Sequence, residues 1–151
     1  MTKKISTLDS HLGYLIRLIS NRVSADFADK INKTGITVAE WVIMRIMFDH
    51  QWITHSQIVK ISGLTKGAIT KTLIKLNGKK LIQKNESKID GRSQRLRLSQ
   101  KGINTLPQLA NLADKNDEEY FSFLNIEEQI FFKKILLQII QTKKITCIPV
   151  D

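Results

Sequence analysis

The chain has 151 residues and a net charge of +10; 42% of its residues are hydrophobic and 25% are charged, as is typical of one soluble globular domain with a hydrophobic core. No apolar run approaches the roughly 20 residues that span a bilayer, no secretory signal pattern follows the basic N-terminus, and the single cysteine, Cys147, excludes a disulfide within the chain. We therefore expect a cytoplasmic protein with no membrane attachment.

The first third of the chain predicts two helices. Apolar residues recur at steps of three and four between residues 8 and 33, and Gly35 marks the end of this first helix. Thr37 begins a second helix, because a threonine followed three positions later by a glutamate, Glu40, forms a capping box. Apolar residues around Trp41 cover much of the circumference of the second helix, so most of it is expected to be buried.

Two short helices joined by a tight turn follow a short extended segment at residues 52–53. A capping box of Thr54 and Gln57 begins the third helix, which ends at Gly63; Thr65 caps the fourth, which continues to about residue 78. The apolar residues of the fourth helix fall on one face at i, i+4 and i+7, and its lysines lie mostly away from that face. The apolar face consists of Ile69, Leu73 and Leu76.

Residues 81–85 and 95–98 predict the two strands of a hairpin, joined by a polar segment with an Asp90-Gly91 turn signal. In the second strand arginine and leucine alternate strictly. The two leucines are therefore expected to face the core, and the two arginines to form a basic outer face.

Two further helices complete the predicted elements. Ser99 caps the fifth helix, and Pro107 lies inside it, where a proline is expected to kink the helix. Asn125 and Glu128 form the capping box of the sixth, which runs to about Lys143. Its apolar residues cover more than one face, so a lone protomer would leave many of them exposed to water.

The positive charge is concentrated in residues 60–101. This segment contains nine lysines, three arginines and two acidic residues, whereas the rest of the chain has equal numbers of basic and acidic residues. Such a distribution is typical of proteins that bind nucleic acid. Because the segment includes the second helix of the helix–turn–helix and the basic hairpin, the sequence predicts a winged helix that binds double-stranded DNA.

The DNA contacts are expected from the fourth helix and the hairpin. The start of the helix would enter the major groove, and the hairpin tip would insert into the adjacent minor groove. The alternative is that the lysines form an ordinary solvated surface. The predicted contact residues are Thr65, Lys66, Gly67, Ala68, Thr70, Lys71 and Lys75 in the helix and Arg92 and Arg95 in the hairpin.

Several segments resemble the MarR-type regulators. Residues 36–43 resemble the leucine-threonine-x-x-x-tryptophan start of that family's second helix, and residues 64–71 resemble the entry to its recognition helix. Residues 81–82 and 90–102 resemble its wing, in which D-x-R is followed by a strand ending in leucine-threonine-x-x-glycine. Residues 125–128 resemble the start of its last helix. The resemblance covers nearly the whole chain, and the wing is its most specific part.

The resemblance implies a mainly α (α+β) fold, a winged helix–turn–helix with long N- and C-terminal dimerisation helices. It implies a single MarR-like domain over residues 1–151 that forms an obligate homodimer. Residues 36–99 would form the DNA-binding region, and residues 5–34 and 100–145 the dimerisation helices.

The resemblance also implies roles for individual residues. Asp90 would brace the wing, and Arg92 would touch the minor groove. Ser56 and Gln57, at the start of the third helix, would contact the DNA backbone.

The chain departs from the family pattern at two places. Lys80 stands where the family usually has glycine before the strand leucine, so the end of the fourth helix is expected to differ, with Gly78 as the candidate terminator. Gly67-Ala68 replaces a common serine-threonine pair, so base recognition is expected to depend more on Thr70 and Lys71.

Many members of the family respond to small anions, phenolic compounds, metals or oxidants, so the resemblance implies an effector. A ligand cleft would lie between the dimerisation helices and the winged helix. The candidate lining residues are His11, Tyr14, Arg17 and Trp41; the alternative is that they are surface, interface or core residues. Cys147 would be a redox sensor only if its thiolate were stabilised, and a lone cysteine in a tail is more often incidental.

The sequence predicts no cofactor, metal site or enzymatic activity, since the three histidines lack metal-ligand spacing and no catalytic constellation is present. We predict a sequence-specific transcription regulator, a ligand- or stress-responsive repressor that binds a pseudo-palindromic operator as a homodimer. Two alternatives stay open: a non-specific architectural DNA binder, and a winged-helix module that binds an acidic protein.

Overall fold

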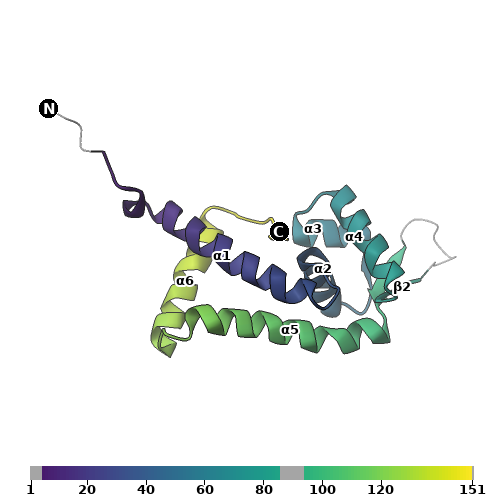
Figure 1. Ribbon diagram of the computed structural model, residues 1–151. Helices are drawn as coiled ribbons and strands as arrows, with labels where there is room; N and C mark the ends of the chain where they lie inside the picture. The colour runs from purple at the N-terminus through teal and green to yellow at the C-terminus, as the bar shows by residue number, and fades with distance from the viewer. Residues whose placement is uncertain (1–4, 86–93, 151) are drawn as a thin grey trace.

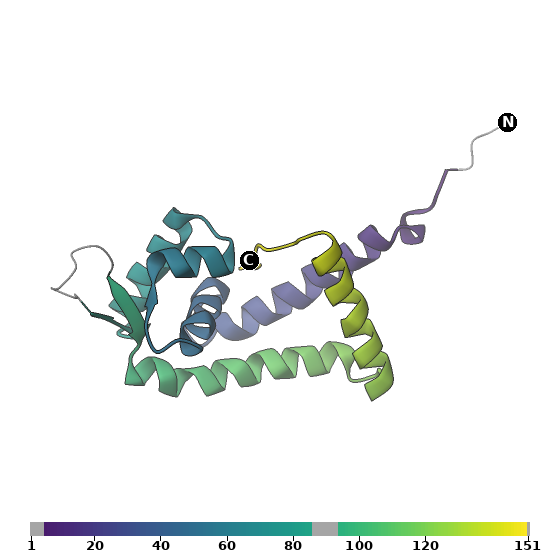
Figure 2. The ribbon, with the colours of Figure 1, turned by 180° about the vertical axis from the view of Figure 1, so that it is seen from behind.

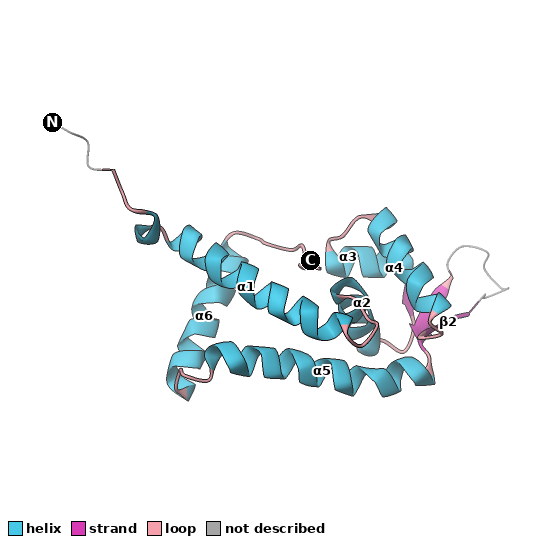
Figure 3. Ribbon diagram, in the orientation of Figure 1, coloured by secondary structure: helices cyan, strands magenta, loops and turns pink. Residues whose placement is uncertain are grey.

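The computed structural model describes residues 5–85 and 94–150, which form six α-helices, one 3-10 turn and a three-stranded sheet (Figures 1 and 3). The predicted mainly α winged-helix fold is confirmed. The elements in chain order are η1 (Leu8–Ser10), α1 (Leu12–Asn32), α2 (Val38–Phe48), β1 (Ile53–Thr54), α3 (His55–Ser62), α4 (Lys66–Gly78), β2 (Ile82–Asn85), β3 (Arg95–Leu98), α5 (Gln100–Phe121) and α6 (Ile126–Thr142).

The molecule has two parts. Elements α2 to β3 form the winged helix at one end of α5, and α1, α5 and α6 form what we call the helical arm (Figures 1 and 2). Helix α1 packs along α5, and α6 crosses the far end of α5. None of the described helices is long and apolar enough to cross a membrane.

The helix starts lie where the capping residues predict them. The side chains of Glu40, Gln57 and Glu128 accept the backbone N–H of Thr37, Thr54 and Asn125, each at 2.8 Å. Each box satisfies two backbone donors that the first turn of a helix leaves unpaired. Only the first helix starts late, at Leu12 and not at residue 8, because His11 is extended and residues 8–10 form a separate 3-10 turn.

The core lies in the winged helix and in the parts of α1 and α5 beside it. Its buried apolar side chains all come from residues 31–109. They include the predicted inner face of α4 and the two leucines of β3. Helix α6, all of which is described, has no buried residue. The winged helix therefore shares one core with the adjoining parts of α1 and α5, and α6 adds nothing to it.

The sheet is antiparallel with the order β1-β3-β2. Ile53 pairs with Leu96, and Ile82 pairs with Leu98, so apolar residues of all three strands face α2 and α4. Arg95 and Arg97 are exposed, as the alternation predicts. The extended segment before α3 is therefore the third strand of the wing sheet.

The end of α4 confirms one expectation and adds a left-handed lysine. Gly78 is the last residue of the helix and does not have a left-handed backbone; Lys80 does, with φ of 61°. A lysine thus occupies the conformation that glycine adopts most easily. The helix ends at Gly78, as predicted, but the left-handed residue that turns the chain is Lys80, two positions later.

The C-terminal tail returns to the winged helix. After α6, Lys144 turns with φ of 52°, and the backbone N–H of Ile148 donates to the carbonyl of Ser62 at 2.9 Å. Gly63, in the turn between α3 and α4, has φ of 68°, and a Cβ there would lie 3.0 Å from the Cα of Cys147. The tail therefore lies directly against the turn of the helix–turn–helix (Figures 1 and 2).

Candidate nucleic-acid interface

Helix α4 has one apolar face and one basic face. Ile69 and Leu76 are fully buried against the core, so the opposite face is left to solvent. Lys66, Lys71 and Lys75 are exposed on the helix. The exposed residues Gly67, Ala68 and Thr70 lie among them. The structure thus brings the predicted contact residues of α4 together on one surface.

The lysines of α4 have no acidic residue near them in the sequence. Residues 50–85 contain neither aspartate nor glutamate. A solvated helix surface normally mixes both signs of charge, because like charges repel and opposite pairs stabilise the helix. The uncompensated charge therefore favours an external polyanion over the alternative of an ordinary solvated surface.

The start of α3 lies beside the basic face of α4. Thr54, Ser56, Lys66 and Thr70 line a shared hollow of about 390 Å³. Lys84 of β2 lines it as well. The sequence reasoning missed Lys84. Alternate residues of a strand lie on the same side, so Lys84 lies on the side of β2 that also carries Ile82. The hollow thus joins α3, α4 and the sheet into one continuous surface.

Some of the predicted contact groups already have partners. Thr65 Oγ1 accepts from the backbone N–H of Ala68 at 3.2 Å, and Gln57 Oε1 accepts from that of Thr54 at 2.8 Å. Both side chains therefore cap helices. The Thr65 hydroxyl keeps its donor and one acceptor position for DNA, and Gln57 keeps its amide donors.

Thr70 is held by a histidine that the sequence reasoning did not select. The Thr70 hydroxyl donates to the carbonyl of Lys66 at 2.9 Å, and His55 Nε2 lies 2.9 Å from the same oxygen. Because a hydroxyl has one hydrogen, His55 is the donor in this second bond. Without exchanging a partner, Thr70 can therefore accept one further hydrogen bond but cannot donate one to a base. No local sequence signal pairs residues 55 and 70, which meet only in the fold.

The two arginines of β3 have different surroundings. Arg97 lies with its guanidinium 4.6 Å from the ring of Trp52, and its Nε donates to Gln83 at 2.9 Å. Arg95 is exposed near the tip of the described hairpin. Arg95 is therefore the freer of the two to contact DNA. The predicted wing residues Asp90 and Arg92 lie outside the described residues.

The candidate effector residues do not meet within one protomer. His11 caps the start of α1, and Tyr14 and Arg17 are exposed in its first two turns. Trp41 is half-buried against the core on α2, which follows the opposite end of α1. Cys147 is exposed in the tail. Within the ranges 5–85 and 94–150, no group of three or more potential ligands could hold a metal.

The comparisons agree with this geometry. Residues 36–94 match the model of the MarR family. The chain is 25% identical over 117 residues to the HTH-type transcriptional regulator SarZ of Staphylococcus haemolyticus, covering 78% of this chain and 80% of SarZ. It is 22% identical over 107 residues to the transcriptional regulator HosA of Escherichia coli O127:H6, covering 71% of this chain and 79% of HosA.

Solved structures share the fold over most of the chain. A mutant of E. coli MarR complexed with operator DNA has a TM-score of 0.75 and 20% identity, over 85% of this chain and 92% of that one. The S. aureus MepR–DNA complex has a TM-score of 0.77 and 24% identity, over 87% and 98%. Bordetella bronchiseptica BpsR, whose DNA binding is regulated by 6-hydroxynicotinic acid, has a TM-score of 0.77 and 19% identity, over 90% and 97%. Residues 36–94 of the chain therefore match the MarR family, and the chain shares the fold of these proteins over most of its length.

Proposed function

We propose that the protein binds a pseudo-palindromic operator as a homodimer and acts as a ligand- or stress-responsive repressor. The observation that carries the proposal is the basic face of α4. It presents Lys66, Lys71 and Lys75 to solvent within a stretch of sequence that has no acidic side chain. In the proposed complex, the start of α4 enters the major groove and the wing follows the adjacent minor groove.

The helical arm supports a homodimer. Ile5, Leu8 and Leu12 are exposed at 91%, 67% and 76%, and Ile130 and Phe131 of α6 at 63% and 64%. Burial of one such side chain stabilises by about 1.5–3 kcal/mol. A protein that leaves this many of them in water needs a partner surface. The exposed side chains occur on both terminal segments of the chain, so two copies that interlock by these segments would cover them.

A two-fold dimer defines the form of the operator. Each protomer presents one α4, so the two half-sites are inverted repeats about one helical turn apart, roughly 34–36 Å. The lysines supply most of the affinity through phosphates, and the few residues that face bases supply selectivity. Thr70 and Lys71, with Arg92 in the wing, are the proposed determinants of selectivity.

An effector would act on the relative orientation of the two winged helices. A ligand that binds the released conformation more tightly than the DNA-bound one shifts the population toward release. BpsR, which shares this fold, is regulated by an aromatic acid, and we propose a phenolic or anionic effector here. His11, Tyr14, Arg17 and Trp41 remain the proposed lining residues. The first three are distant from Trp41 along α1, so such a cleft would need the partner protomer.

The experiment that tests the function is selection from a random duplex library by the purified protein at about 150 mM salt, where non-specific binding is weak. Recovery of an inverted repeat would support both a sequence-specific regulator and a two-fold dimer. Binding to every sequence alike, with loss near physiological salt, would indicate an architectural protein. Absence of DNA binding at any salt would favour a protein-binding module.

A further inference from the structure

The chain passes between the winged helix and the helical arm at two covalent connections. One is the link between α1 and α2, around Gly35; the other is Ser99, between β3 and α5. Residues 79–81, which follow α4, contact both connections, and we call them the arm junction. The junction is the place where the recognition helix is fixed relative to the arm.

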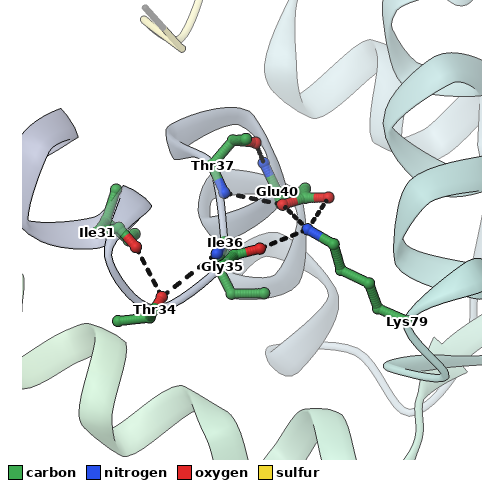
Figure 4. A network of polar contacts seen from close by, with 7 residues as sticks. All are labelled: Ile31, Thr34, Gly35, Ile36, Thr37, Glu40 and Lys79. Atoms are coloured by element: carbon green, nitrogen blue, oxygen red, sulfur yellow. Dashed lines mark hydrogen bonds and ion pairs between the residues drawn. The ribbon is translucent and has the colours of Figure 1, made fainter.

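On the α1–α2 side, the contact is an ion pair between a buried carboxylate and a partly exposed lysine. Lys79 Nζ lies 2.7 Å from each carboxylate oxygen of Glu40 and donates to the carbonyl of Gly35 at 2.6 Å (Figure 4). Glu40 is fully buried, and the same carboxylate accepts the backbone N–H of Thr37 at 2.8 Å. One lysine therefore connects the end of α4 to the first turn of α2 and to the link from α1.

On the α5 side, the junction contributes its backbone carbonyl groups as acceptors. The carbonyl of Lys80 accepts from the Ser99 hydroxyl at 2.7 Å, and the carbonyl of Lys79 accepts from Lys101 Nζ at 2.9 Å. The N–H of Ser99 donates to the carbonyl of Leu81 at 2.9 Å. Gly102 lies so close that a Cβ there would be 2.2 Å from the Leu81 carbonyl oxygen. The first turn of α5 therefore rests on the junction.

The charge of Glu40 is not needed for its capping role. At the start of α3, Gln57 accepts the N–H of Thr54 at 2.8 Å, the same distance at which Glu40 accepts that of Thr37. A neutral amide thus completes a capping box in this same protein. The buried negative charge at position 40 is explained by its pairing with Lys79, because an unpaired buried carboxylate is strongly unfavourable.

A small rotation at the junction would move the end of α4 proposed to contact DNA. Helix α4 has 13 residues, so its far end, which would contact bases, lies about 20 Å away. A rotation of about 10° at the junction would move that end by about 3.5 Å. This is roughly the rise of one base pair. Small changes at the junction are therefore large enough to change which operator spacing fits the dimer.

We propose that Glu40 and Lys79 are positioning residues that determine the half-site spacing of the operator by fixing the angle of α4 relative to α2 and to the link from α1, and thus to the helical arm. The inference rests on the proposed function, since it requires a dimer on a two-part site. Neither side chain contacts DNA in this proposal; both act through α4. The interface itself, and thus the affinity for a single half-site, does not depend on the pair.

The test uses the selected operator and versions of it whose spacer is one or two base pairs shorter or longer. The variant E40Q keeps the capping acceptor and removes the charge, and Lys79 is exposed enough to turn to solvent. A matched control is D49N, which makes the same change at an exposed ion pair with Arg45 at the end of α2. K79R keeps the positive charge and serves as the conservative variant.

The expected result is a loss of discrimination between spacer lengths, with little change in the affinity for a single half-site. The preference of the wild type for its own spacing should fall about three- to tenfold in E40Q. D49N and K79R should keep the wild-type profile, and single half-site affinity should stay within about twofold in every variant. If E40Q fails to fold, E40Q combined with K79M, which leaves no charge at the site, is measured in its place.

Two results would overturn the inference. One is a folded E40Q with the wild-type spacing profile; the other is a loss of affinity that is equal on all spacers and on the half-site, since that indicates a structural role alone. A wild type with no spacing preference is a different failure. It would contradict the proposed two-part operator, and the inference would fall with it.

Discussion

The winged helix and the helical arm contain similar apolar side chains, but the two parts differ in how far these side chains are buried. In the winged helix, Ile69 and Leu76 of α4 are fully buried and face residues of the same chain. In the arm, Phe131 and Ile130 of α6 have the same apolar character and are more than 60% exposed. The contrast shows that the apolar pattern of a helix predicts that one face will be covered. The pattern does not predict whether the same chain or a partner chain covers it.

The two parts also differ in how their polar groups are used. In the winged helix the lysines of α4 have no acidic neighbours in the sequence, so they are available to a polyanion. Where α1 packs along α5, polar groups pair within the chain: Lys30 donates to Asn116 at 2.9 Å, and Tyr120 donates to Asp26. We therefore expect the arm to tolerate loss of DNA contacts, and the winged helix to tolerate loss of the dimer.

The largest effect should come from a charge on the exposed apolar face of α6. In a two-fold dimer, Phe131→Asp buries two unpaired carboxylates and should weaken dimerisation by about 4–6 kcal/mol. Analytical ultracentrifugation should show monomers, and affinity for the full operator should fall while the far-UV circular dichroism is retained. Lys133→Asp, about 200° around the helix, is the control. A dimeric Phe131→Asp protein would mean that the dimer uses another surface.

The next effect should be confined to the winged helix. Ile69→Ala removes a fully buried side chain and should lower the free energy of unfolding by about 2–4 kcal/mol, as measured in urea. Ile74, 65% exposed on the same helix, is the matched control, and Ile74→Ala should change stability by at most about 0.5 kcal/mol. Equal losses for the two variants would contradict the assignment of Ile69 to the buried core.

A smaller effect is expected from the wing. Arg92→Ala should weaken operator binding by about 1–3 kcal/mol if the side chain makes a specific minor-groove contact. Fluorescence anisotropy with the selected operator and with a scrambled duplex would measure it, and the dimerisation constant should not change. Unchanged operator affinity would remove Arg92 from the mechanism and leave α4 as the main DNA contact.

The smallest effect should be a gain in stability. Lys80→Gly replaces a lysine at φ of 61° with the residue that adopts this conformation without steric strain, so the free energy of unfolding should rise by about 0.5–1 kcal/mol. Thermal and urea unfolding would measure it. Gly78→Ala is the comparison variant. Gly78 has a helical backbone, which alanine also adopts, so alanine should be tolerated there. A destabilised Lys80→Gly protein would indicate that the lysine side chain makes up for its backbone strain.

The helix starts and the wing strand could be predicted because their signals are local. Thr37 with Glu40, Thr54 with Gln57, and the Arg-Leu alternation of residues 95–98 each need only a few neighbouring residues. The basic face of α4 could be predicted for the same reason. The family resemblance then allowed α3 and the wing to be assigned to one interface.

Two of the missed contacts join residues that are distant in the sequence. His55 meets Thr70, and Lys79 meets Glu40 across 39 positions. No periodicity in the sequence encodes such a pair, because the partners meet only after the helices pack. The left-handed residue at Lys80 was not predicted, for a related reason. A glycine is the usual choice for a left-handed residue, but here the contacts of the Lys79 side chain and the Lys80 carbonyl hold the turn two positions after Gly78.

The contact between the C-terminal tail and Gly63 has a practical consequence. Cys147 is the single thiol of the chain, it is exposed, and its backbone lies against the turn that precedes the recognition helix. A maleimide fluorophore would therefore attach at one defined position without prior mutagenesis. Its emission should change when DNA or an effector alters the surroundings of that turn. The same contact makes the C-terminal tail a poor place for an affinity tag.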